Sequence, residues 1–226
     1  NFTNTTKGGP LLFIEQNLLR FPQPMNSAGV YGTAMHKAIE ERIMYPKYHE
    51  GEDASLAHLV AVLQKEVKRG RLPRTEELRQ TERGEKTLAH FYRSTKDYFL
   101  PDDKIEVDMK NEGIIIDGAH LTGKLDFLRL RNGAYEIIDF KTGKSFTAWD
   151  EAKSDDDKIK LHKYRQQLIT YKILLENSIH FKEYPIHKSA LWFVEEEPIV
   201  ELELDADDEE IERTKKLISA VYKKIV

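Results

Sequence analysis

The stretch GKLDFLRL-RNG-AYEIIDFK, residues 123–141, decides the fold of this 226-residue chain. Two runs in which apolar residues alternate with other residues flank the pair Asn132-Gly133. This arrangement is the strongest short-range signal for a β-hairpin, because both residues tolerate the positive φ that a type I′ turn requires. With these two residues at the centre of the turn, Arg131 faces Ala134, and the register of every other pair follows.

The predicted register gathers charged side chains at the end of the hairpin remote from the turn. It places Asp126 opposite Asp139, and Lys141 lies on the same face as Asp139 because side chains alternate along a strand. Facing Cβ atoms are roughly 4.5–5.5 Å apart, a distance at which two carboxylates destabilise a sheet. A bound cation would remove this penalty. Nearer the turn, Arg129 faces Glu136, which predicts an ion pair between the strands.

The composition restricts which cation this is. The chain has no cysteine, so thiolate zinc sites and iron–sulfur clusters are excluded. Paired carboxylates favour a hard ion such as Mg²⁺ or Mn²⁺, with the backbone carbonyl of Phe140 as a further ligand. Lys141 would then orient a water molecule or neutralise charge on a phosphate, as phosphoester hydrolysis requires. The hairpin alone leaves open the alternative that Asp126, Asp139 and Lys141 form a surface salt-bridge ladder.

The rest of the chain has the pattern of alternating helices and strands. Apolar periodicity predicts helices at 11–20, 30–44, 54–70, 75–99, 157–177 and 207–225, and strands at 104–110, 113–119, 123–131, 134–141, 188–195 and 198–204. Loops are expected around 45–53 and 143–156. We therefore expect an α/β fold with a central mixed sheet flanked by helices. Its predicted divisions are a flexible tail at 1–10 and one domain over 11–226, mainly helical over 11–100, with the sheet core over 101–204 and a last helix over 205–226.

Charge and hydropathy exclude several functions. The formal net charge of −4 argues against nucleic-acid binding through bulk electrostatics alone. No stretch approaches the roughly 20 apolar residues of a membrane span, and the polar N-terminus lacks the pattern of a signal peptide. We therefore expect a cytoplasmic protein without a membrane partner. The missing initiator Met suggests a fragment of a longer chain or a processed one.

Four motifs in a fixed order resemble one family of nucleases. GKLD at 123–126 and IDFKTG at 138–143 resemble the core of the PD-(D/E)XK nucleases, in the RecB-like branch. YGTAMH at 31–36 resembles an upstream helix motif in which a histidine joins the metal site, and QLITY at 167–171 resembles the Gln-x-x-x-Tyr motif that follows the core. LRFPQ at 19–23 further resembles nuclease domains fused to UvrD/Rep-type helicases.

The resemblance implies roles for individual residues. It implies that His36 joins Asp126 and Asp139 as metal ligands and that Lys141 is the catalytic lysine. It also implies that further side chains position or contact DNA, and we expect these to be Gln167, Tyr171, Lys144 and Lys124. Residues 158–165 form a basic cluster that leads into Gln167, as a DNA-facing helix would, although such charge runs are often solvated faces.

The sequence departs from the family pattern at one position. Leu125 stands before the first aspartate, where the family signature has proline. The literal Pro101-Asp102-Asp103 lies far upstream of the lysine and is expected to be a turn from helix to strand. Glu106 resembles an acidic residue of some relatives, but an exposed strand glutamate explains it equally well, so it stays secondary.

The sequence thus predicts a Mg²⁺- or Mn²⁺-dependent deoxyribonuclease, and more narrowly an exonuclease. Its expected partners are DNA and a helicase motor in the same polypeptide or complex, in DNA repair and recombination. One alternative is a nuclease-like domain that binds DNA without cutting it, and another is a scaffold for a helicase. Neither alternative has a need for opposed carboxylates beside a lysine.

Overall fold

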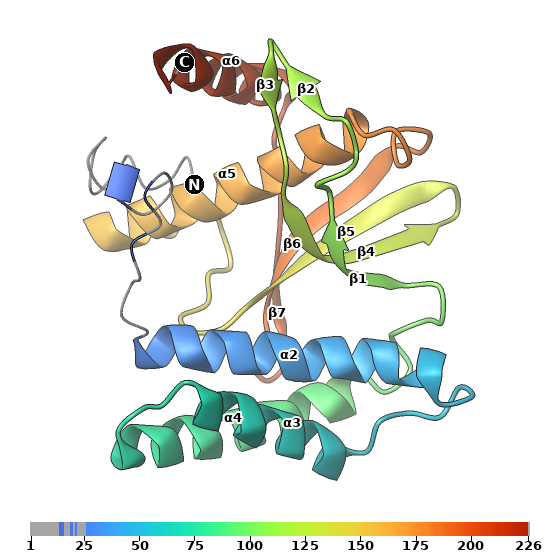
Figure 1. Ribbon diagram of the computed structural model, residues 1–226, viewed down its shortest axis with the longest axis vertical. Helices are drawn as coiled ribbons and strands as arrows, with labels where there is room; N and C mark the ends of the chain where they lie inside the picture. The colour runs from blue at the N-terminus through green and yellow to red at the C-terminus, as the bar shows by residue number, and fades with distance from the viewer. Residues whose placement is uncertain (1–13, 16–18, 20, 22–25, 226) are drawn as a thin grey trace.

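The computed structural model describes residues 14, 15, 19, 21 and 26–225, and Figure 1 shows how they are arranged. The tail expected at 1–10, most of the helix expected at 11–20 and most of the LRFPQ motif lie outside the described residues. Within the described part, no helix combines the length and the apolar character that crossing a membrane demands.

Three helices form the N-terminal layer of the fold, and they are α2 (Ser27–Tyr48), α3 (Leu56–Arg69) and α4 (Arg74–Ser94). The side chains of Asn26 and Ser55 cap α2 and α3 by accepting backbone N–H groups of the first turn. The predicted loop at 45–53 begins too early, because α2 continues through Pro46. The ring of Tyr45 stacks on that of His49 at 3.6 Å between centroids, and this packing stabilises the last turn.

Five strands form a mixed sheet in the order β1-β4-β5-β6-β7. Their bounds are β1 Lys104–Asp108, β4 Lys124–Arg131, β5 Ala134–Lys141, β6 Ile186–Phe193 and β7 Val200–Glu203. Only β5 and β6 are parallel, and parallel neighbours need a long crossover, which contains α5 (Asp155–Glu176). The last helix, α6 (Asp208–Ile225), packs on α5 through a small apolar cluster.

The segment predicted as one strand at 113–119 is a small hairpin instead. It consists of β2 (Ile115–Ile116) paired with β3 (Ala119–His120). Asp117 and Gly118 connect the two strands with φ values of +47° and +86°. Asp-Gly is a preferred pair for such a turn, so this signal outweighs the apolar run that predicted a single strand.

The hairpin over 123–141 has the predicted register. Its strand pairs run without a gap from Arg131–Ala134 to Phe127–Ile138. The predicted ion pair of Arg129 with Glu136 is wrong. Arg129 is 2% exposed and binds Asp103, with Nε–Oδ1 at 2.7 Å and Nη2–Oδ2 at 2.5 Å. A buried guanidinium requires a buried partner, which the predicted turn at 101–103 supplies.

Helices cover both faces of the sheet (Figure 1). The layer of α2, α3 and α4 packs on one face, against Phe127, Ile138 and Phe140. Helix α5 packs on the other face, against Leu128 and Ile137. Alternation along each strand sends neighbouring residues into different cores. The predicted α/β fold, with a mixed sheet flanked by helices and an N-terminal helical region, is confirmed.

Candidate active site

The β4–β5 ladder opens at the end remote from the turn. Pairing ends at Phe127–Ile138, so Asp126 and Asp139 do not form the ladder pair that the register predicted. Beyond this point the backbone N–H of Phe140 donates to Oδ2 of Asp126 at 3.0 Å, and the Phe140 carbonyl oxygen lies 2.8 Å from Nε2 of His36. On the side of β5 that faces β4, the side chains of Asp126 and His36 therefore take the place of backbone hydrogen-bond partners for Phe140.

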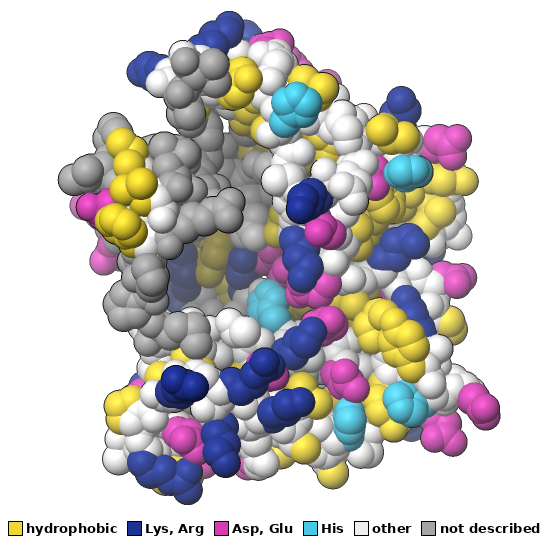
Figure 2. Space-filling view, in the orientation of Figure 1, with side chains coloured by type: hydrophobic (Ala, Val, Ile, Leu, Met, Phe, Trp, Pro, Cys, Tyr) yellow, Lys and Arg dark blue, Asp and Glu magenta, His cyan; other side chains and the backbone are white. Residues whose placement is uncertain are grey.

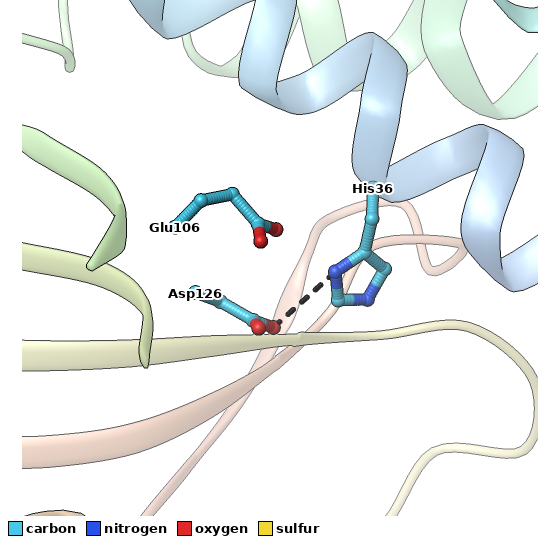
Figure 3. A group of neighbouring side chains, drawn as sticks. All are labelled: His36, Glu106 and Asp126. Atoms are coloured by element: carbon cyan, nitrogen blue, oxygen red, sulfur yellow. Dashed lines mark ion pairs between the residues drawn. The ribbon is translucent and has the colours of Figure 1, made fainter. Parts of the chain in front are cut away.

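The pairing of β4 with β1 is interrupted at the same residue. The pairs on both sides of the Glu106–Asp126 position are formed, but this pair is not. Glu106 has a φ of +54°, a strained conformation for a residue with a Cβ atom. Figure 3 shows its carboxylate beside that of Asp126, with the ring of His36 next to both. One ligand atom from each of the three side chains lies within 4.8 Å of the others.

The hydrogen bond to Phe140 sets the orientation of the His36 ring. A carbonyl oxygen can only accept, so Nε2 carries the hydrogen in this contact. The other nitrogen, Nδ1, lies 3.4 Å from Oδ2 of Asp126 and in the neutral ring presents a lone pair to the carboxylates. Metal-binding histidines in proteins are oriented in this way, by a backbone carbonyl on the second nitrogen.

The donor set of His36, Glu106 and Asp126 fits a hard divalent cation. Ligands at about 2.1 Å in an octahedral site are roughly 3 to 4.2 Å apart, and a small inward movement of groups within 4.8 Å reaches this spacing. Two carboxylates and one imidazole suit Mg²⁺ or Mn²⁺. The fully buried carboxylate of Asp139 adds negative charge close to this group.

Asp139 belongs to a network of hydrogen bonds with α5 rather than to this triad. Its Oδ1 accepts from Nε2 of Gln167 at 2.8 Å and from the hydroxyl of Tyr171 at 3.0 Å, and its Oδ2 lies 2.6 Å from Nζ of Lys141. Lys141 also donates to Oε1 of Gln167 at 2.8 Å. Gln167 and Tyr171 share one helix face because they are four residues apart. The network fixes the position of the lysine ammonium group.

The electrostatics of the site oppose the ionisation of all its acids at once. Burial raises the pKa of Asp126 to about 8, and the negative charge of Asp139 adds to this increase. Burial also raises the pKa of Tyr171, again with a contribution from Asp139, so its hydroxyl stays protonated as a donor. A cation in contact with the carboxylates would lower the energy of their ionised forms.

The two lysines expected to contact DNA have carboxylate partners. Lys124 forms an ion pair with Glu106, and Nζ of Lys144 lies 2.6 Å from Oδ2 of Asp157. Both side chains remain more than half exposed, at 57% and 54%. In the basic segment 158–165, Arg165 binds Glu210 and Asp205 instead of facing outward as part of one basic surface.

Sequence patterns do not indicate the roles of two acidic residues at the site. Glu106 is only a secondary candidate by sequence, although the register of β1 against β4 places it opposite Asp126. Glu195 follows β6 and accepts the N–H of Gly143 at 2.5 Å while it binds Arg83 through two N–H groups at 2.8 Å each. It thereby fixes the loop that follows Lys141. No motif in the sequence indicated this contact.

The surface around the site carries both signs of charge. Figure 2 shows a hollow between the layer of α2, α3 and α4 and the upper part of the molecule, with Lys and Arg side chains gathered along its lower rim. Acidic side chains stand among them. This mixture agrees with the small net charge and still offers cations where a polyanion could approach.

The fold and the site define an α/β protein with a candidate acidic metal site and an adjacent lysine. The model of the PD-(D/E)XK nuclease superfamily matches residues 4–226, nearly the whole chain. The chain belongs to this superfamily. No curated protein is similar enough in sequence to be matched to it.

Proposed function

We propose that this protein is a metal-dependent deoxyribonuclease, with Mg²⁺ or Mn²⁺ as its cofactor. The opening of the β1–β4 and β4–β5 ladders at Asp126 carries the proposal, because His36, Glu106 and Asp126 come together there beside the Asp139–Lys141 pair. This partly buried arrangement of acids, with Glu106 in a strained conformation and Asp139 fully buried beside it, is costly for a structural role alone. Membership of a nuclease superfamily supports the same conclusion.

Each residue then has a distinct role in phosphodiester hydrolysis. His36, Glu106 and Asp126 hold the cation, which when bound polarises the phosphate and activates water. Asp139 and Gln167 hold the Lys141 ammonium group at 2.6 and 2.8 Å, so it neutralises negative charge that develops on the phosphate without first reorganising. The carbonyl of Phe140 orients the His36 ring and has a second lone pair for the cation.

We further propose that the domain acts as an exonuclease module beside a helicase motor in DNA repair or recombination. The resemblance of its ordered motifs to the RecB-like branch supports this narrower proposal. A nuclease-like domain that only binds DNA is the competing function. The intact network around Lys141 favours catalysis, because DNA binding alone does not require a lysine fixed by Asp139 and Gln167.

The test is Mn²⁺-dependent cleavage of end-labelled linear and circular DNA, single- and double-stranded. Asp139→Asn and Lys141→Ala should each lower the rate by roughly 10²–10³-fold. Lys182→Ala, at an exposed lysine in the loop before β6, is the matched control and should leave the rate unchanged. Circular dichroism checks that each variant is folded.

The outcomes separate the proposals. Full activity in both site variants would refute the site assignment. Binding without cleavage, with Mn²⁺ or Mg²⁺, would favour the DNA-binding alternative. Rapid cleavage of circular DNA would refute the exonuclease mode and leave the nuclease proposal intact.

A further inference from the structure

One lysine near the site has no carboxylate partner within ion-pair distance among the described residues. This residue is Lys160 on α5. By contrast, Lys124, Lys141 and Lys144 each form an ion pair with an aspartate or glutamate. The hydrogen bond found for Lys160 runs to the backbone carbonyl of Lys144, at the long distance of 3.4 Å. Its ammonium group is therefore available to an anion.

The position of Lys160 on α5 directs it to the active site. Residues 160, 164, 167 and 171 follow one another at spacings of four, three and four, so they share one face of the helix. This is the face from which Gln167 and Tyr171 reach Asp139. Lys160 thus lies on the same face of α5 as Gln167 and Tyr171, nearer the N-terminal end of the helix.

Two aromatic rings link Lys160 to the other lysines. Its Nζ lies 5.5 Å from the centroid of the Tyr164 ring, and Nζ of Lys141 lies 4.8 Å from the same centroid. Its Nζ also lies 5.5 Å from the centroid of the Phe146 ring, and Nζ of Lys144 lies 5.2 Å from that centroid. Each ring therefore lies close to two of the three ammonium groups, which gathers Lys141, Lys144 and Lys160 around Tyr164 and Phe146.

The charges in this cluster are not balanced. Asp157 pairs with Lys144, and Asp139 pairs with Lys141, which leaves the charge of Lys160 in excess. Burial lowers the pKa of Lys160, and the charges of Lys144 and Lys141 add to this decrease against the opposing effects of Asp157 and of Glu195, which is itself paired with Arg83. A diester phosphate, with one negative charge and two free oxygens, complements such a group.

We infer that Lys160 and Lys144 form a phosphate-binding subsite that holds a backbone phosphate of the nucleic-acid substrate beside the one at Lys141. The inference rests on the proposed nuclease function, since it takes the substrate to be a polynucleotide. Lys144 exchanges Asp157 for the phosphate, and its exposed side chain makes this exchange inexpensive. Lys160 contributes charge without breaking an existing pair.

The experiment measures binding of a fluorescent oligonucleotide, as single strand and as duplex, by anisotropy in EDTA from 50 to 200 mM KCl. Lys160→Met keeps the length of the stem and removes the charge, and Lys160→Arg keeps the charge. Lys158→Met is the matched control, because residue 158 lies on nearly the opposite side of α5 and its side chain is 67% exposed. Thermal unfolding verifies that all three variants are folded.

Lys160→Met should weaken binding by roughly 10-fold, the usual effect of losing one charged hydrogen bond. It should also reduce the slope of log K against log salt by about 0.7 for the single strand and 0.9 for the duplex, because one phosphate contact is lost. Lys160→Arg and Lys158→Met should retain the wild-type slope. A purely structural lysine would not change this slope.

Failure of the subsite and failure of the nuclease proposal give different results. An unchanged slope in Lys160→Met overturns the subsite, and Mn²⁺-dependent cleavage by the wild type still supports the nuclease. A reduced slope in a chain that cleaves no DNA supports the subsite and overturns the nuclease. A wild-type chain without measurable binding at 50 mM KCl overturns the subsite.

Discussion

Replacement of Asp126 by asparagine should stabilise the metal-free protein, and by more as the pH rises. The pKa of Asp126 rises from an ordinary value of 3.8 to about 8, first through burial and then through the charge of Asp139. The folded protein therefore holds a proton that the unfolded chain releases. This contribution to stability is fully present below about pH 4 and is lost as the pH rises to about 8.

The size of the effect follows from the same pKa values. One pKa unit corresponds to about 1.4 kcal/mol, so the whole shift corresponds to roughly 6 kcal/mol as an upper value. The free energy of unfolding of the wild type should fall by about 1.4 kcal/mol per pH unit relative to Asp126→Asn between pH 5 and 8. Asparagine keeps an oxygen that can accept the N–H of Phe140, so the variant retains this hydrogen bond.

Urea unfolding in EDTA from pH 5 to 9 measures this difference directly. Asp150→Asn, at an exposed aspartate, makes the same chemical change on the surface and is the matched control. Mn²⁺ at about 100 times its dissociation constant should add about 2.7 kcal/mol to the wild type and much less to Asp126→Asn. A pH-independent difference for Asp126→Asn, or a variant less stable than wild type at pH 8, would refute the reasoning.

Two further predictions concern the catalytic network and the core. Gln167→Met removes the side-chain amide that joins Asp139 to Lys141. The turnover number for DNA cleavage should fall by roughly 10–100-fold with little change in melting temperature. An unchanged turnover number would contradict a positioning role for Gln167. Asp103→Ala leaves the guanidinium of Arg129 buried without its partner and should lower the free energy of unfolding in urea by about 3–5 kcal/mol. A loss below 1 kcal/mol would mean that water or another residue replaces the carboxylate.

The sequence predicts the hairpin well because local rules determine it. The Asn132-Gly133 turn fixes the register, and alternation then assigns each residue to a face. The faces of Asp139 and Lys141 follow directly. Helix spacing likewise places Gln167 and Tyr171 together on α5. These parts of the fold and of the candidate site depend on residues that are close in sequence.

The remaining features depend on contacts between distant segments. The positive φ of Glu106 and the opening of both ladders at Asp126 are not local preferences of those residues. Arg129 binds Asp103 rather than Glu136. This pairing depends on the end of α4 and on the burial of the turn that follows it, which together place Asp103 beside the guanidinium group. Periodicity gives no information on such partners.

Contacts between residues far apart in the sequence, such as those of Phe140 and Glu195, affect when the site forms during synthesis of the chain. Its hydrogen bond to His36 joins residues 104 positions apart, and Glu195 reaches back 112 positions to Arg83. Such long-range contacts form late in folding, after most of the chain has left the ribosome. A nascent or truncated chain that lacks α5 lacks Gln167 and Tyr171, which fix the Asp139–Lys141 pair in place. If the proposed nuclease function holds, the cutting activity is expected only after α5 has packed on the sheet.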